Sequence, residues 1–207
     1  RASQVGSHLG QASLTLQADT FERLCLGQLH ETIGPSESED ATAHYIQVMA
    51  DKTGSLISAS ARLGIVLSGA PAEFEEPLRV YGEKVGVAFQ LIDDVIDISE
   101  AGPSGKTPGT DLRAGVPTLP VLLLRKAAAD GDSEAQSLID FIDAGLEEEA
   151  KLNEALVRLR NHEVAELSYL EAKRWADEAV EALEILPEGS VKNALAQFAQ
   201  AVVDRTN

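Results

Sequence analysis

Apolar residues recur at steps of three and four along most of this chain, which is the spacing of one face of an α-helix. The first stretch of this kind covers 13–33 and ends at the Gly34-Pro35 pair, a strong helix stop. Later stretches predict helices over 41–67, 72–99, 118–129, 132–144, 146–160, 161–185 and 190–205, with Thr118 as an N-cap. No strand pattern or internal repeat is evident. The pattern predicts an all-α fold, a bundle of about eight helices, and we interpret 1–207 as one domain.

The amino-acid composition favours helices, and the net charge limits the classes of ligand that we expect the protein to bind. The chain is 44% hydrophobic but only 4% aromatic, and its 17 Lys and Arg against 34 Asp and Glu leave a net charge of −17. This charge repels phosphates, so we expect no binding of nucleic acid. An acidic protein that takes a phosphorylated substrate needs divalent cations or a few well-placed basic side chains.

The only cysteine and the hydropathy of the chain indicate in which cellular compartment we expect the protein. Cys25 cannot form an internal disulfide, and its apolar neighbours in the first helix predict a buried, inert thiol, which fits a reducing cytoplasm. No stretch approaches the roughly 20 apolar residues that span a bilayer. No charged-then-apolar leader opens the chain. We expect a soluble cytoplasmic protein without a transmembrane segment, with peripheral membrane contact left open.

The third predicted helix carries the candidate chemistry. At 100° per residue, one third of its circumference holds Gly82, Gly86, Gln90, Asp93, Asp94 and Asp97. We interpret this side as facing a cavity, with the glycines making room and the acids at its end. Carboxylates three and four residues apart can converge on shared cations, and hard oxygen ligands suit Mg²⁺. The alternative is a solvated acidic face, which the interleaved leucine, isoleucines and valine disfavour.

Two lysines could supply positive charge. Lys106 lies in the segment EAGPSGKTPGTD, whose glycines and prolines rule out a regular element and could fold the lysine over an anion. Lys52 and the adjacent Thr53 lie in a helix rich in small residues. Each lysine also has an ordinary interpretation: Lys106 as a solvated loop residue, and Lys52 as a surface lysine whose stem covers apolar surface.

At these residues the chain resembles a known family. GVAFQLIDDVIDIS followed by GKTPGTDLRAGVPTLPVLLL is similar to the second aspartate-rich motif and following loop of the trans-isoprenyl (polyprenyl) diphosphate synthases. YIQVMADKTGSLISAS resembles that family's Lys-Thr helix, and GQLHE its upstream Gly-Gln helix. The resemblance covers nearly the whole chain.

The resemblance implies an isoprenoid-synthase-like helical bundle and a prenyltransferase. Such an enzyme ionises an allylic prenyl diphosphate with the help of Mg²⁺, adds the cation to isopentenyl diphosphate and removes a proton. Carried over by position, the expected metal ligands are Asp93, Asp94 and Asp97, the diphosphate contacts Lys52 and Lys106, the groups near the allylic cation Thr53 and Gln90, and a weaker pocket contact Gln28. A homodimer is also implied.

Two departures from the family pattern matter. Val116 stands where many members have lysine, and no second DDxxD occurs in the chain. The resemblance therefore implies that the family's N-terminal helices, with the first aspartate-rich motif, precede Arg1, and that the 207-residue chain alone is inactive. The alternatives are a noncatalytic or regulatory subunit of a heteromeric synthase, which has no need of these acids and lysines, and a class I terpene cyclase, which the GKTPGTDL loop disfavours. Product chain length stays open.

Overall fold

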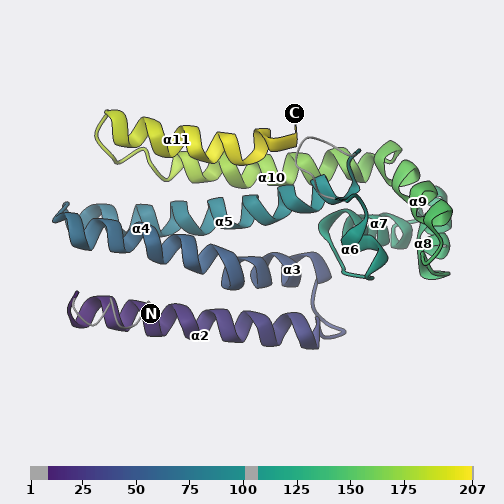
Figure 1. Ribbon diagram of the computed structural model, residues 1–207, viewed down its shortest axis with the longest axis horizontal. Helices are drawn as coiled ribbons and strands as arrows, with labels where there is room; N and C mark the ends of the chain where they lie inside the picture. Colours follow the sequence, from purple (N-terminus) through teal and green to yellow (C-terminus); the bar gives the residue numbers. More distant parts are fainter. Residues whose placement is uncertain (1–8, 101–106, 207) are drawn as a thin grey trace. The chain divides into compact units, whose positions relative to one another are not determined.

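A computed structural model describes residues 9–100 and 107–206, and every regular element in these ranges is helical. Figure 1 shows the helices in chain order. The α-helices are α2 (Gln11–Ile33), α3 (Ala41–Met49), α4 (Ser55–Ser68), α5 (Glu75–Ile98), α6 (Thr110–Arg113), α7 (Leu119–Ala129), α8 (Ser133–Asp143), α9 (Glu149–Asn161), α10 (Glu163–Glu181) and α11 (Ser190–Val203). Three short turns, η1 (Ala50–Gly54), η2 (Ala72–Phe74) and η3 (Asp204–Thr206), complete them. The all-α prediction is confirmed.

The predicted helix ends agree with the structure to within a few residues, with two differences. The helix expected over 41–67 is interrupted by η1, a π turn that separates α3 from α4. The segment interpreted as wholly irregular ends in the first residues of the short helix α6. Sequence periodicity misses both because a π turn adds only one residue to the helical repeat, and a helix of one turn shows no period.

The contacts of the chain define two compact units. Unit 1 contains the residues up to Gln90 and Arg174–Val203, and unit 2 contains Leu91–Lys173 and the residues from Asp204. The interpretation of the whole chain as one domain stays a prediction.

Unit 1 is a stack of long helices. In Figure 1, α4 lies between α2 and the first part of α5, and α11 lies on the other side of α5. The core contains Val48, Tyr81 and Val85, each no more than 2% exposed. The Tyr81 hydroxyl donates to the carbonyl of Leu195 in α11 at 2.8 Å, and burial raises the pKa of Tyr81 to about 12. These contacts make α5 the central element of unit 1.

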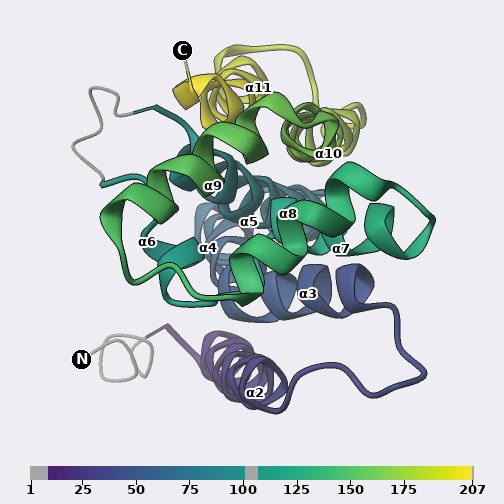
Figure 2. The ribbon, with the colours of Figure 1, turned by 90° about the vertical axis from the view of Figure 1, so that its right-hand side faces the viewer.

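Unit 2 is built around the end of α5. Figure 2 shows α7, α8 and α9 as neighbours, in agreement with the packing of α7 on α8 and of α8 on α9. Its core is formed by Ile98, Leu112, Val121, Leu124, Ala135, Leu138, Ile139, Leu146, Leu152, Ala155, Leu156, Leu159 and Val164. Ile98 therefore anchors the last turn of α5 in this core.

The surface of α2 differs from the expectation for Cys25. The thiol is exposed, and so are Phe21, Leu29 and Ile33 on the same helix, at 68%, 51% and 71%. The prediction of a buried thiol was wrong because these apolar positions form a side of α2 that none of the described residues covers.

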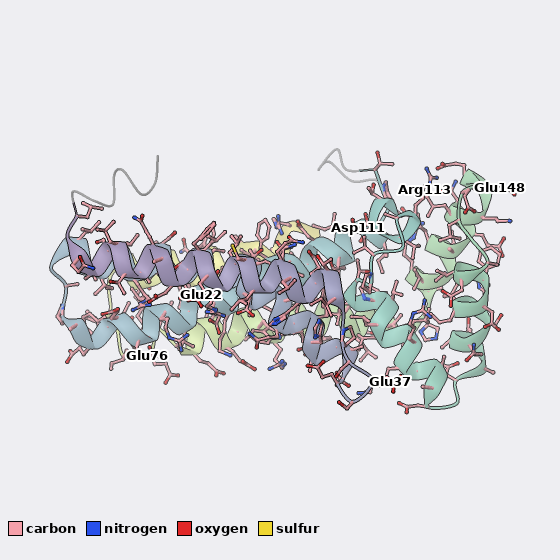
Figure 3. All side chains as sticks on the ribbon, turned by 90° about the horizontal axis from the view of Figure 1, so that it is seen from below. Glu22, Glu37, Glu76, Asp111, Arg113 and Glu148 are labelled. Atoms are coloured by element: carbon pink, nitrogen blue, oxygen red, sulfur yellow. The ribbon has the colours of Figure 1, made fainter. Side chains whose placement is uncertain are left out.

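Acidic side chains account for much of the remaining surface. Figure 3 shows Glu22, Glu37 and Glu76 on the outside of unit 1. Within the described ranges, no helix combines the length and the hydropathy needed to cross a membrane.

Candidate functional site

Asp97 is held by the N-terminus of α6 in unit 2. Its carboxylate accepts hydrogen bonds from the backbone N–H groups of Thr110, Asp111 and Leu112, at 3.1, 3.2 and 3.4 Å. These amides lack partners within their own helix, so a carboxylate stabilises them as a capping side chain does. Burial raises the pKa of Asp97, and the backbone hydrogen bonds oppose this effect. Asp97 thus ties the loop after α5 to the end of α5.

Asp94 likewise accepts a hydrogen bond from the N-terminus of the next helix, α7. It is 6% exposed and accepts from the N–H of Leu119, the first residue of α7, at 2.9 Å. Thr118 occupies the predicted N-cap position, but its side chain makes no capping hydrogen bond. The capping acceptor therefore comes from α5, a partner that the local sequence around Thr118 does not reveal.

Asp93 is the most accessible of the three acids. Its Oδ1 accepts from Nη2 of Arg205 at 2.9 Å, with the two side chains 26% and 36% exposed respectively. The guanidinium therefore pairs with a carboxylate that the sequence predicts to bind Mg²⁺. Sequence reasoning did not select Arg205, because nothing in the local pattern relates the chain's last residues to α5.

The three acids were expected to converge on shared cations. No cluster of three or more His, Cys, Asp or Glu side chains is arranged to hold a metal among the residues that the structure describes. The donor set fits Mg²⁺ chemically, because it consists of carboxylates, the hard oxygen ligands that this ion prefers. The Asp97 carboxylate already accepts from three backbone amides. All three lie on one helix, and Asp94 and Asp97 are withdrawn from solvent. The metal assignment stays a prediction.

Lys52 lies on η1 in unit 1 and contacts an acid that sequence reasoning missed. Its Nζ is 2.6 Å from Oε2 of Glu31 on α2, and the same oxygen accepts from Nε2 of Gln28 at 2.9 Å. The structure thus brings Lys52 and Gln28 together through Glu31. The signal was present in GQLHE, where Glu31 follows Gln28 by three residues and shares its face.

The other expected site residues have different outcomes. Thr53 and Gln90 are both half-buried in unit 1. Lys106 lies outside the described residues, so its expected contact is untested. Val116, at the position where lysine is common, is 40% exposed.

The glycines of α5 do not make room for a cavity. A Cβ at Gly86 would lie 2.5 Å from Cα of Gly54, and one at Gly82 would lie 2.6 Å from Cα of Ser58. Both glycines instead allow α5 to pack directly against the backbone of η1 and α4. The interpretation that they line a cavity was wrong, because small residues on a helix allow a neighbouring helix to approach as readily as they open a space.

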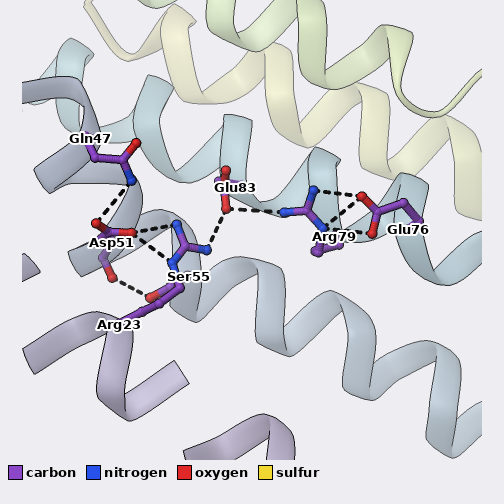
Figure 4. Close-up of polar contacts among 7 residues, drawn as sticks. All are labelled: Arg23, Gln47, Asp51, Ser55, Glu76, Arg79 and Glu83. Atoms are coloured by element: carbon purple, nitrogen blue, oxygen red, sulfur yellow. Dashed lines mark hydrogen bonds and ion pairs between the residues drawn. The ribbon is translucent and has the colours of Figure 1, made fainter. Parts of the chain in front are cut away.

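A chain of polar contacts joins η1 to α2 and α5 within unit 1 (Figure 4). Arg23 of α2 donates to Oδ1 of Asp51 at 2.8 Å and to Oε2 of Glu83 at 2.7 Å. Gln47 donates to the other oxygen of Asp51 at 3.1 Å. Arg79 bonds Glu76 and reaches Glu83 at 3.5 Å. The turn that carries Lys52 is therefore attached to both neighbouring helices.

Comparison with known proteins finds relatives that match nearly the whole chain. The polyprenyl synthetase family model matches residues 1–159. Nonaprenyl diphosphate synthase of Mycobacterium tuberculosis is 39% identical over 205 residues, which cover 99% of this chain and 60% of that protein. Octaprenyl diphosphate synthase of Haemophilus influenzae is 34% identical over 194 residues and is covered over 58% of its length. The chain thus spans about 60% of the length of its relatives.

The fold of the chain also matches that of a solved synthase structure. Geranylgeranyl pyrophosphate synthase of Corynebacterium glutamicum, complexed with calcium and isoprenyl diphosphate, matches with a TM-score of 0.89 and 36% identity, over 100% of this chain and 63% of that one. Because the family's sequence pattern extends over residues 1–159 and the relatives match nearly the whole chain, the chain belongs to the polyprenyl synthetase family.

Proposed function

We propose that this chain is the part of a trans-prenyltransferase that binds Mg²⁺ and the allylic diphosphate. The enzyme condenses an allylic prenyl diphosphate with isopentenyl diphosphate. The observation that carries the proposal is the run Gln90–Asp97 on α5, where a half-buried amide is followed by three carboxylates, two of them less than 10% exposed. Support comes from the relatives' names, which are those of prenyl diphosphate synthases, and from the calcium and isoprenyl diphosphate of the C. glutamicum structure.

The roles follow from the chemistry of each side chain. Asp93, Asp94 and Asp97 would hold Mg²⁺, which when bound supplies the charge that the leaving diphosphate needs. Asp93 would hold the metal in place of its guanidinium partner, Arg205. Lys52 exchanges Glu31 for a diphosphate oxygen, since an ammonium binds phosphate as a compact point charge. Lys106 would be a second diphosphate contact.

Positive charge also develops on the allylic carbon. The side-chain oxygens of Thr53 and Gln90 have dipoles that stabilise such a cation without forming a bond to it. Gln28, held by Glu31, is a pocket contact in this proposal. Thr53 and Gln90 are half-buried, and their partial withdrawal from bulk water strengthens their electrostatic effect.

The assembly is part of the proposal. The exposed apolar side of α2, with Phe21, Leu29 and Ile33, would be covered by the same side of a second copy, which gives a homodimer. The protein would be cytoplasmic, because an exposed free thiol such as that of Cys25 persists in a reducing compartment. The alternative of a noncatalytic subunit is disfavoured by the presence of the three aspartates together with Lys52.

The test compares two proteins. The first is the 207-residue chain, and the second is an extended form, in which the N-terminal region of the C. glutamicum synthase precedes these 207 residues. Both are incubated with Mg²⁺, an allylic diphosphate and labelled isopentenyl diphosphate. We expect condensation by the extended form and almost none by the chain alone. In the extended form, Asp93→Ala should lower turnover by about 10²-fold or more, because charge stabilisation in the transition state is lost.

Two outcomes would contradict the proposal. Efficient turnover by the 207-residue chain would show that the remaining length of the relatives is not needed. An Asp93→Ala variant with near-normal rates would exclude the metal assignment. Val157→Ala, at a half-exposed position on α9, is the control for substitution as such.

A further inference from the structure

The turn that carries Lys52 and Thr53 has an unusual backbone. In η1 the N–H of Ser55 donates to the carbonyl of Ala50, five residues back, as in a π-helix. The Ser55 hydroxyl donates to the carbonyl of Asp51 at 2.6 Å, so a side chain supplements the backbone pattern. Single π turns within α-helices are rare and are frequent at functional sites. The position of Lys52 depends on whatever stabilises this turn.

Neighbouring helices confine the turn sterically. A Cβ at Gly27 of α2 would lie 2.8 Å from Cβ of Asp51 and 3.1 Å from Cγ of Lys52. On the other side, a Cβ at Gly54 would lie 2.9 Å from the carbonyl oxygen of Glu83 in α5. These contacts limit how far the turn can move toward either helix, but they do not fix its rotation.

The side chain of Asp51 supplies a directional contact. It is 12% exposed, and a carboxylate withdrawn from water in this way needs a charged or hydrogen-bonding partner. Arg23 donates from Nε to its Oδ1 at 2.8 Å, and the ion pair between the two side chains has Nη2 at 2.7 Å from the same oxygen. The remaining nitrogen, Nη1, bonds Glu83 at 2.7 Å. One planar guanidinium thus connects the π turn to α5 from its place on α2 (Figure 4).

We propose that Arg23 is a positioning residue: by holding Asp51 it sets the π turn so that Lys52 and Thr53 are presented to the diphosphate substrate. Arg23 itself touches no substrate. The inference rests on the proposed function, and it adds a residue that no motif of the sequence indicates. Small displacements of a substrate-binding group reduce catalysis by about 10²-fold.

The experiment uses the extended form with Arg23→Gln, which keeps the length of the side chain and removes its charge and fork. Arg79→Gln is the matched control, because Arg79 belongs to the same chain of contacts and bonds Glu76 and Glu83 but is not among the partners of Asp51. We expect Arg23→Gln to raise KM for the allylic diphosphate and to lower kcat/KM about 10- to 100-fold, with Arg79→Gln within about threefold of the parent.

A second measurement does not depend on turnover. Calorimetric titration with Mg²⁺ and inorganic diphosphate should show binding weakened by Arg23→Gln and by Lys52→Met, but not by Arg79→Gln. Hydrogen exchange should become faster at the amides of 50–56 in Arg23→Gln, while α7 and α8 keep their protection. Asp51→Asn should reproduce the Arg23→Gln effect, and the double variant should be no worse than either, because the two residues act as one unit.

The outcomes separate this inference from the proposed function. If the parent protein shows no condensation, the proposed function fails, while diphosphate binding and exchange at 50–56 still test the role of Arg23. If the parent is active, equal losses in Arg23→Gln and Arg79→Gln would overturn the inference, and so would additive effects of Arg23→Gln and Asp51→Asn. If Arg23→Gln fails to fold, Arg23→Lys replaces it, with the same loss expected in smaller degree.

Discussion

At the scale of single residues, the three acids of α5 differ in their partners. Asp94 and Asp97 accept hydrogen bonds from the first backbone amides of α7 and α6, whereas Asp93 pairs with Arg205. The spacing of the three acids predicted a shared metal site, which stays a prediction. Sequence reasoning could not identify their partners, because backbone amides 13 to 25 residues away leave no trace in the local pattern.

This difference leads to a prediction about stability. Asp97→Ala removes the acceptor for three amides of α6 and should lower the free energy of unfolding by about 1–2 kcal/mol. Asp93→Ala should leave stability nearly unchanged, because an exposed ion pair contributes at most about 1 kcal/mol. Urea unfolding followed by circular dichroism measures both. A stable Asp97→Ala variant would show that the capping contacts contribute little.

At the scale of elements, the helix that carries Lys52 is shaped by its neighbours. The apolar period predicted one helix over 41–67, but η1 separates α3 from α4 within it, and residues of α2 and α5 lie close to this turn. Gly86 is the closest of these contacts, since its Cα faces the backbone of Gly54. The sequence pattern was interpreted as placing Gly86 beside a cavity, whereas the structure places it against the backbone of η1.

Two glycine substitutions test this packing. Gly86→Ala would place a Cβ 2.5 Å from Cα of Gly54, so we expect a loss of about 1–3 kcal/mol of stability through overpacking. Gly64→Ala in α4 has no atom within 4 Å of the added Cβ, and it should raise stability by about 0.5–1 kcal/mol, because alanine favours a helix interior. Thermal unfolding of the two variants compares them directly. Equal behaviour would contradict the close approach of α5 and η1.

At the scale of the whole molecule, one apolar side of α2 is exposed and is not covered by any of the described residues. The periodicity of α2 predicted burial for its apolar residues, and Cys25 was assigned to the core on that ground. Burial of these residues requires another surface to cover that side of α2, and none of the described residues does so.

The homodimer proposal is testable there. In the extended form, Phe21→Glu places a charge in the proposed contact and should reduce the mass measured by light scattering to that of one chain, because an unpaired buried charge strongly opposes association. Val191→Glu is the control, since Val191 on α11 is equally exposed, at 68%. A dimer that survives Phe21→Glu would place the interface elsewhere.

The sequence by itself determined the helical fold and most helix ends, because helical period and stop signals are local properties of the chain, and its motifs supplied the resemblance that selected the candidate site residues. Only the tertiary structure decided that two of the acids cap helices, that Glu31 pairs with Lys52, that Arg23 bonds Asp51 of the π turn and that the glycines of α5 face a helix. Each of these contacts joins residues distant in the chain, and their geometry depends on packing.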